Sequence, residues 1–355
     1  MIWPVFVADS EKKVRHKKTA LFTMALFCFA GLASGQSKDN TEVELDLLYS
    51  FPNEQVDEVL LAQPTRMAIV DSLIFIMDYG LNAVLKYDLN GRLLQMMDNR
   101  GEGPGEFWGA FALACTNDKL YLVDSGNARL QMYDLDFAYL GSFKIMSHGF
   151  DIPVHEGLIY NQDLSELAAA LTDEKGMIAV LNEQGRVVKR FGDYLDLTPN
   201  YELAKPVNKS WMDLYKGRLY VLSKYYPILR VYALDGTLEQ TIEFESRGYK
   251  KRVRGNYDWS RLVKGTTSLP TRYLFRAIDV NERGIFVGLY SEDLIIDHYD
   301  QEGNFIRRLK KKPRDSEEPY YLHDFEVRVS EDGELLFYIL NEQVIPEMGV
   351  FKARS

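Results

Sequence analysis

The chain is poor in the residues that most often build catalytic and metal centres. Its 355 residues include two cysteines and five histidines. The histidines after residue 35, at positions 148, 155, 298 and 323, show no metal-type spacing, and no Gly-x-Ser-x-Gly elbow occurs. Cys115 ends the apolar segment Phe111–Cys115, which predicts a small buried core residue rather than a reactive thiol. The composition therefore favours binding over catalysis.

The sequence also lacks an apolar run long enough to cross a bilayer. Its longest such run, residues 19–32, follows five basic side chains and precedes the small residues Ala33, Ser34 and Gly35. This order is typical of a secretory signal peptide, here residues 1–35. With Cys115 as the remaining cysteine, no internal disulfide can form. We expect an exported protein, periplasmic or extracellular, that is soluble after cleavage and has no membrane span.

Basic side chains are outnumbered, 42 against 52 acidic ones, and the formal charge is −10. Removal of residues 1–35 takes away five basic and two acidic side chains and moves it to −13. Such a surface argues against nucleic-acid binding. An exception is the insertion 246–269, where basic and aromatic residues alternate. It predicts a patch for an anionic partner or, alternatively, a solvated loop; its candidate residues are Lys250, Lys251, Arg252, Arg254 and Trp259.

What the chain has in quantity is short strand-like segments separated by turn residues. Segments ending in an aromatic-acidic pair, such as Tyr87-Asp88 and Tyr133-Asp134, recur along the chain. Aligned on this position, the first four units are 46, 48 and 51 residues apart, and the fifth follows after 67. Repeats of this length in strand-type sequence are typical of β-propeller blades rather than helical solenoids.

Six blades account for the segments, at about 64–98, 109–145, 150–191, 207–245, 271–310 and 322–354. The last is one strand short, whereas the segment 42–51 is an alternating strand with no partner nearby in sequence. The economical solution pairs the two and closes the ring, which hides both edges. We therefore predict an all-β fold: one six-bladed propeller over residues 36–355, built of four-stranded antiparallel blades and monomeric. A short helical insertion is expected at 163–172.

Two segments carry a resemblance to known propellers. Residues 124–134, Asp-Ser-Gly-Asn-Ala-Arg-Leu-Gln-Met-Tyr-Asp, resemble the NHL-repeat consensus. Residues 100–107, Arg-Gly-Glu-Gly-Pro-Gly-Glu-Phe, resemble the Gly-rich inter-blade segment of secreted six-bladed propellers of Bacteroidetes-type bacteria. The resemblance implies the fold and is compatible with enzymes, signalling modules and binding scaffolds alike.

The candidate ligand site is the channel mouth where the first strands of the blades begin. We expect Arg66, Trp108, Trp211, Arg272 and His323 to ring the opening, with Tyr79, Asn127, Tyr225 and Tyr226 behind them. Aromatic rings beside guanidinium groups suit a sugar or a carboxylated ligand. The alternative is that the large side chains plug the channel, and that Asn127 only organises its own loop with Asp124 and Arg129.

A different class of function remains open. Asp151, Asp213, Asp279 and Asp324 fall in first-strand regions. If they converge on the axis, they could bind Ca²⁺, as in lactonase-like propellers, because hard cations need clustered oxygens. The main prediction is an exported propeller that needs no cofactor and binds a small molecule, a glycan or a surface-assembly protein. The alternative is a divalent-metal-dependent hydrolase or lyase.

Overall fold

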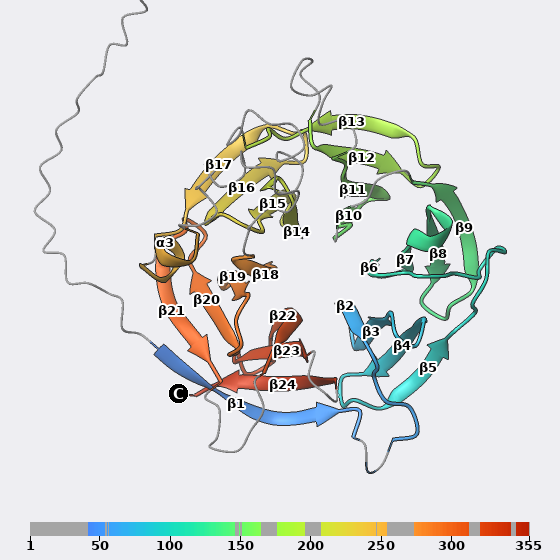
Figure 1. Cartoon of the computed structure of the whole chain (residues 1–355), viewed down its shortest axis with the longest axis horizontal. Helices are drawn as coiled ribbons and strands as arrows, with labels where there is room; N and C mark the ends of the chain where they lie inside the picture. Colours follow the sequence, from blue (N-terminus) through green and yellow to red (C-terminus); the bar gives the residue numbers. More distant parts are fainter. Residues whose placement is uncertain are drawn as a thin grey trace, which may run out of the picture. The chain divides into compact units, whose positions relative to one another are not determined.

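The computed structural model describes residues 42–53, 55, 57–145, 149, 151–164, 176–195, 207–245, 247–253, 273–311, 320–341 and 346–354. These residues belong to one compact unit, Asn40–Ser355. Their strands form six blades arranged as a ring (Figure 1). The predicted six-bladed all-β fold is confirmed. Among the described helices, none is long and apolar enough to cross a membrane.

Each of the first five blades is a four-stranded antiparallel sheet in sequence order. Blades 1 and 2 consist of β2 (Pro64–Val70), β3 (Leu73–Asp78), β4 (Ala83–Asp88), β5 (Leu93–Met97), β6 (Ala112–Cys115), β7 (Lys119–Asp124), β8 (Arg129–Asp134) and β9 (Tyr139–Lys144). Blades 3 and 4 consist of β10 (Val154–His155), β11 (Leu158–Gln162), β12 (Ile178–Asn182), β13 (Val187–Phe191), β14 (Ser210–Tyr215), β15 (Arg218–Ser223), β16 (Ile228–Ala233) and β17 (Leu238–Glu243). Blade 5 consists of β18 (Phe275–Asn281), β19 (Gly284–Leu289), β20 (Ile295–Tyr299) and β21 (Phe305–Lys310). Blade 6 consists of β22 (Leu322–Val329), β23 (Leu335–Asn341), β24 (Glu347–Ala353) and β1 (Glu42–Phe51).

The second strand of each blade packs against neighbouring blades on both faces, so its middle residues form a continuous apolar run or nearly so rather than alternating. All six residues of β19 are buried, as are five of the six in β3. Large cores lie between blades: Phe75 of blade 1, for example, shares a cluster with Leu120 and Tyr133 of blade 2. The blades are therefore held together mainly by apolar contact.

The ring is closed by β1, as predicted. Leu45 pairs with Ala353 and Phe51 with Met348 in an antiparallel ladder, so β1 forms the outer strand of blade 6 (Figure 1). Its first residues also pair in parallel with blade 5, with Glu42 opposite Arg308. One strand thus joins β21 and β24 into an eight-stranded sheet and covers two edges at once.

Substitution in β1 tests the closure. Leu45 is 3% exposed and belongs to the core between blades 5 and 6, whereas Leu47 in the same strand is 45% exposed. Leu45→Ala should lower the free energy of unfolding by about 2–3 kcal/mol, the cost of a cavity in a packed core. Leu47→Ala should change it by less than about 0.5 kcal/mol. Urea denaturation measures both, and equal effects would contradict closure by a packed strand.

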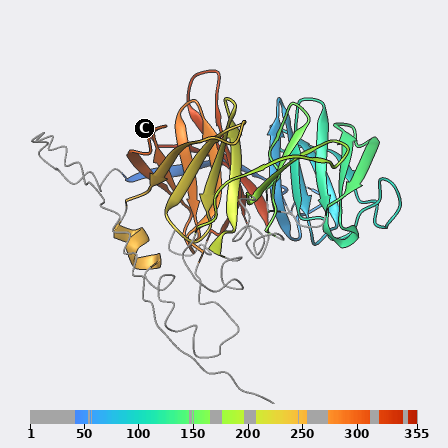
Figure 2. The same ribbon diagram turned by 90° about the horizontal axis from the view of Figure 1, so that it is seen from above.

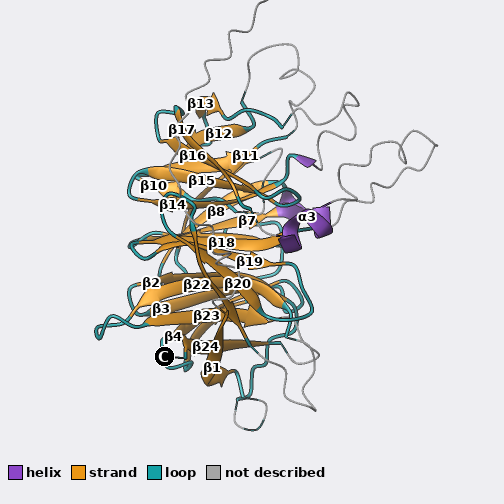
Figure 3. Ribbon diagram, turned by 90° about the vertical axis from the view of Figure 1, so that its left-hand side faces the viewer, coloured by secondary structure: helices purple, strands orange, loops and turns teal. Residues whose placement is uncertain are grey.

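A short helix, α3 (Arg247–Val253), occupies the start of the insertion 246–269, for which the sequence predicted an anionic-partner patch or a solvated loop. Figures 2 and 3 show it on one side of the disc of strands. Tyr249 anchors it: this side chain is fully buried, and its hydroxyl donates a hydrogen bond to Asp297. This contact joins residues 48 positions apart, which no local pattern predicts, and residues 254–269 of the insertion lie outside the described part of the chain. The helical insertion predicted at 163–172 lies largely outside the described residues.

Candidate functional site

The first strands of the six blades surround a central channel with a volume of about 370 Å³. Its walls carry the four aspartates singled out in the sequence, Asp151, Asp213, Asp279 and Asp324, together with Glu326. Cys115 also lines the channel, half-buried rather than enclosed in the core. Burial raises the pKa of the Cys115 thiol well above its ordinary value, so the group is not a reactive thiolate.

The channel carboxylates connect neighbouring blades by accepting backbone N–H groups. An oxygen of Asp213 accepts from Val280 at 2.6 Å, which joins blade 4 to blade 5. Likewise, Glu326 accepts from the amide of Ile69 at 2.9 Å. The same contact is made by Asp151 to Met212 at 2.8 Å and by Asp324 to Met67 at 3.0 Å. These oxygens are already used, and no group of three His, Cys, Asp or Glu in the described part of the chain could hold a metal ion.

Most of the channel carboxylates are hard to ionise. Burial raises the pKa of Asp324 to about 6, of Asp213 to about 7 and of Glu326 to about 8. Repulsion between neighbouring carboxylates adds to the effect. Part of the acidic lining is therefore protonated near neutral pH, and each such group still offers its carbonyl oxygen to the next blade.

A second cavity, of about 220 Å³, opens where the first strands begin. We refer to it as the mouth pocket. It combines cationic and aromatic side chains and is lined by Thr65, Arg66, Phe111, Trp211, Lys224, Tyr273, Phe275, Arg276 and His323. Three of these, Arg66, Trp211 and His323, are among the five residues predicted to ring the opening.

Irregular strand pairing shapes this pocket. In β2, β18 and β22 the ladder to the next strand skips one residue, at Thr65, Arg276 and His323 respectively. Each skipped residue lines the mouth pocket. A bulge re-aims a side chain away from the regular alternation and is common next to binding sites. Three bulges at the same level of three blades turn polar groups toward one cavity.

Arg66 and Trp211 both line the pocket and contact each other. The Nε of Arg66 lies 3.1 Å from Asp151, and its guanidinium carbon lies 4.4 Å from the centre of the Trp211 ring. The indole N–H donates to the carbonyl of Phe275 at 3.0 Å. Both side chains are nearly buried, 5% and 4% exposed, so they are held in place before any ligand arrives.

Other predicted site residues lie elsewhere. Trp108 is 51% exposed, and its ring faces Arg100 at 5.8 Å from the guanidinium carbon rather than the mouth pocket. Tyr79 is exposed as well. The prediction that Trp108 rings the opening is wrong, because its backbone N–H is fixed to Asp124 at 3.0 Å and its side chain turns outward.

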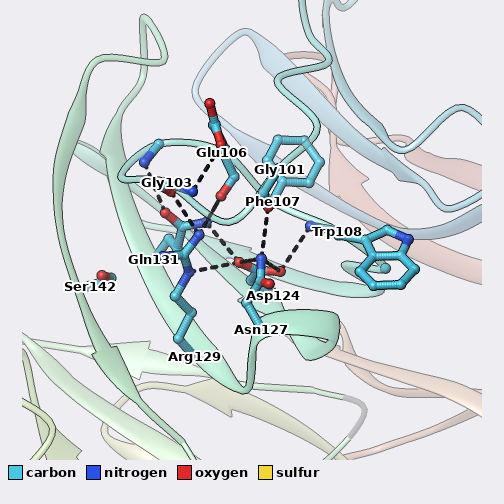
Figure 4. Close-up of polar contacts among 12 residues, drawn as sticks. Gly101, Gly103, Glu106, Phe107, Trp108, Asp124, Asn127, Arg129, Gln131 and Ser142 are labelled. Carbon is cyan, nitrogen blue, oxygen red and sulfur yellow. Dashed lines mark hydrogen bonds and ion pairs between the residues drawn. The ribbon is translucent and has the colours of Figure 1, made fainter.

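Asn127 acts within a polar clamp (Figure 4). Its amide donates to the carbonyl of Gly101 at 2.9 Å and to the carboxylate of Asp124. Arg129 donates to Asp124 at 2.8 Å and to the carbonyl of Gly103 at 2.8 Å. The NHL-like residues thus hold the Gly-rich segment 100–107 against blade 2. This agrees with the loop-organising alternative and removes Asn127 from the mouth pocket.

The remaining predicted residues fall into three groups. Tyr225 and Tyr226 are buried behind the mouth pocket, where Tyr225 stacks on Tyr273 with ring centres 5.1 Å apart. Lys250 and Lys251 are exposed on α3, whereas Arg252 donates to the carbonyl of Tyr290. Predicted residues outside the described part of the chain are Arg272, Arg254 and Trp259.

Comparison with known families gives a match over more than half of the chain. Residues 45–252 fit the model of the DUF5128 family, described as a 6-bladed beta-propeller. The chain belongs to this family. No curated protein matches this DUF5128 chain.

Solved structures similar to the DUF5128 chain share its fold at low identity. An exported protein of Bacteroides fragilis has a TM-score of 0.57 and 11% identity, covering 88% of this chain and 99% of its own. A member of the duf4221 family from Bacteroides vulgatus has a TM-score of 0.55 and 11% identity, covering 88% and 98%. A streptogramin B lyase has a TM-score of 0.50 and 9% identity, covering 87% and 98%. At such identities the likeness shows the fold alone.

Sequence reasoning missed Lys224 and Arg276 in this DUF5128 propeller. Arg276 follows the first residue of β18 just as Trp211 follows the first residue of β14 and His323 that of β22. Alignment of the first strands on that position would have found it. Lys224 lies in the connection between β15 and β16 beside the predicted Tyr225, and no pattern in the sequence marks it.

Proposed function

We propose that this protein is an exported binding propeller that holds a small anionic molecule in the mouth pocket. The observation that carries the proposal is the lining: Arg66, Lys224 and Arg276 converge with the rings of Trp211 and Tyr273 on one cavity of about 220 Å³. Converging polar groups in an aromatic-walled cleft are the usual signature of a ligand site. This volume suits a ligand of about monosaccharide size.

The chemistry of the lining defines the ligand class. Guanidinium groups pair with carboxylates and phosphates through two parallel hydrogen bonds. Aromatic faces cover the apolar face of a sugar ring or a flat aromatic ring. A sugar acid, an aromatic acid or a small phosphate ester satisfies both requirements. The overall charge of −10 makes this cationic pocket locally distinct, so it selects for an anion that the rest of the surface repels.

Export is part of the same proposal. The order of basic, apolar and small residues in 1–35 supports it, and a similar structure is described as an exported protein of Bacteroides fragilis. Fractionation of the native host tests this component by itself: the protein should be recovered outside the cytoplasm without residues 1–35. Recovery of uncleaved protein in the cytoplasm would contradict export. Ligand binding in the mouth pocket would still be tested by the binding experiments.

The binding component is tested with Arg276→Ala. Arg276 is half-buried and donates to the carbonyl of Leu322 at 3.2 Å, so its removal should cost little stability. A thermal-shift screen of sugar acids, aromatic acids and phosphate esters, each beside its neutral analogue, identifies a ligand. Calorimetric titration should then show about 10- to 100-fold weaker binding to the variant, the value of one charge-assisted pair.

Arg92→Ala provides the matched control, since Arg92 is a largely exposed arginine of blade 1 whose partner Asp88 is four residues away. It should bind the ligand like the parent protein. Equal affinity of the parent and Arg276→Ala for every acid found by the screen would place the site elsewhere. A preference for neutral analogues would contradict the anionic ligand class.

A further inference from the structure

Lys224 is fixed in the wall of the mouth pocket by its backbone. Its N–H donates to the carbonyl of Lys209 at 3.0 Å, and its own carbonyl accepts the N–H of Leu274 at 2.7 Å. The side chain is 3% exposed. Its Nζ lies 3.6 Å from the centre of the Trp211 ring and 5.2 Å from that of Tyr273. The amine therefore sits among the aromatic walls of the cavity in a defined position.

The charges around Lys224 disfavour its ammonium form. Among the described side chains, Arg66, Lys209 and Arg276 act on it as cations and Asp151 as an anion. The negative charge of Asp151 does not act on Lys224 alone, because its carboxylate also contacts Arg66 at 3.1 Å and accepts the N–H of Met212 at 2.8 Å. Burial first, and then the neighbouring cations, lower the pKa of Lys224 to about 6.

The aromatic faces act in the opposite direction. Each of the two cation–π contacts stabilises the ammonium by about 30-fold in its equilibrium. The fall of the pKa from 10.5 to about 6 corresponds to a change of more than about 10,000-fold. Burial and like charge therefore outweigh the rings, and the pKa of the amine stays well below that of an ordinary lysine.

We propose that Lys224 is a reactive amine that forms an imine with small aldehydes or ketones carrying an anionic group. A lysine that is desolvated beside other cations is a nucleophile at neutral pH. In the reaction the Nζ lone pair adds to the carbonyl carbon and gives a carbinolamine. The carbonyl oxygen then leaves as water with the two protons of the amine while the C=N bond forms, so no oxidant or reductant is consumed.

The preference for an anionic carbonyl compound rests on the proposed function, because the guanidinium groups of Arg66 and Arg276 hold the anionic group. The carbonyl carbon must then reach Nζ within the same cavity of about 220 Å³. Carboxylate and phosphate satisfy the guanidinium groups equally well. The experiment therefore uses one aldehyde that carries a phosphate and one that carries a carboxylate.

The test is a labelling experiment on the full protein at pH 7. Pyridoxal 5′-phosphate is compared with pyridoxal, and 4-carboxybenzaldehyde with benzaldehyde; borohydride reduces any imine, and mass spectrometry locates the label. Lys224 should be labelled at least tenfold faster than the exposed Lys144, and faster by the charged member of each pair. The rate of labelling reports the amine, and the charged-to-neutral ratio at Lys224, divided by the same ratio at Lys144, reports the anion site, because this division cancels the intrinsic reactivity of each aldehyde.

The outcomes separate the two proposals. If Lys224 is labelled no faster than Lys144, the proposal of a reactive amine is overturned. The anion site in the mouth pocket is then tested by the binding experiment with Arg276→Ala. Fast labelling of Lys224 with the same charged-to-neutral ratio as at Lys144 keeps the amine and contradicts the anion pocket. Arg276→Gln should remove most of the charge preference while Lys224 remains labelled by pyridoxal. Lys224→Arg should abolish the fast label, and the experiments on the parent protein stand even if that variant does not fold.

Discussion

Replacing Glu326 by glutamine is expected to leave stability at pH 5 almost unchanged and to raise the free energy of unfolding at pH 9 by about 2–4 kcal/mol. Burial raises the pKa of Glu326 from 4.5 to about 8. The folded protein therefore keeps a proton that the unfolded chain releases, and it loses stability as pH rises from about 4.5 to 8. Glutamine does not ionise, and its carbonyl oxygen can still accept the N–H of Ile69.

The expected gain is smaller than the full difference between the two pKa values, which corresponds to about 5 kcal/mol. Glu326 keeps part of its surface against the channel. A polar channel of about 370 Å³ has room for several water molecules, which solvate the carboxylate and reduce the cost of its charge.

The measurement is urea denaturation of the parent protein and Glu326→Gln at pH 5, 7 and 9. The difference between the two is decisive because other groups act in the opposite sense. Burial lowers the pKa of His298 to about 4 and of Lys224 to about 6, so each adds stability as pH rises toward its unfolded value. Glu331→Gln, at an exposed position near the end of β22, is the matched control for replacing a glutamate by glutamine. An effect of Glu326→Gln that is equal at pH 5 and pH 9 would show that Glu326 is ionised in the folded protein throughout.

The second large effect is expected at Asp124, the centre of the clamp in Figure 4. Its side chain is fully buried and accepts hydrogen bonds from the backbone of Trp108 and the side chains of Asn127, Arg129 and Gln131. Asp124→Ala removes the partner charge of a nearly buried guanidinium and leaves several donors unsatisfied. We expect a loss of about 3–5 kcal/mol in the free energy of unfolding.

Asp118→Ala is the matched control, since Asp118 lies at the other end of β7 and accepts one exposed hydrogen bond from Thr116. It should cost less than about 1 kcal/mol. Guanidinium chloride denaturation compares the two. If Asp124→Ala costs no more than Asp118→Ala, the clamp contributes nothing beyond an ordinary turn. The position of the Gly-rich segment 100–107 would then have to come from the burial of Phe107.

Strand positions could be predicted closely where local signals agree. The blade expected at about 64–98 contains β2 to β5, which run from Pro64 to Met97. Here the apolar runs and the intervening turns all lie within a few residues of one another. The closure by β1 was also predictable, because an unpaired strand at one end and a missing strand at the other have one economical solution.

The mouth pocket was only partly predictable, since its residues depend on contacts between blades. Arg66, Trp211 and His323 follow from the rule that first strands begin at the mouth. Arg276 was missed because blade 5 was expected to begin at about residue 271, whereas its first strand, β18, begins at Phe275. The channel aspartates could be placed on first strands, but their partners are amides 61 to 257 residues away, which no local pattern reveals.

The double pairing of β1 has a consequence for the order of folding. Asp46 and Arg354, which form an ion pair, are 308 residues apart. Closing a loop of that length is entropically among the costliest steps, so it comes after the local hairpins of the blades have formed. During synthesis, β1 emerges early and has no partner until β21 and then β24 are complete. For that interval the nascent chain presents bare strand edges, and a chaperone that binds extended segments would find its target there.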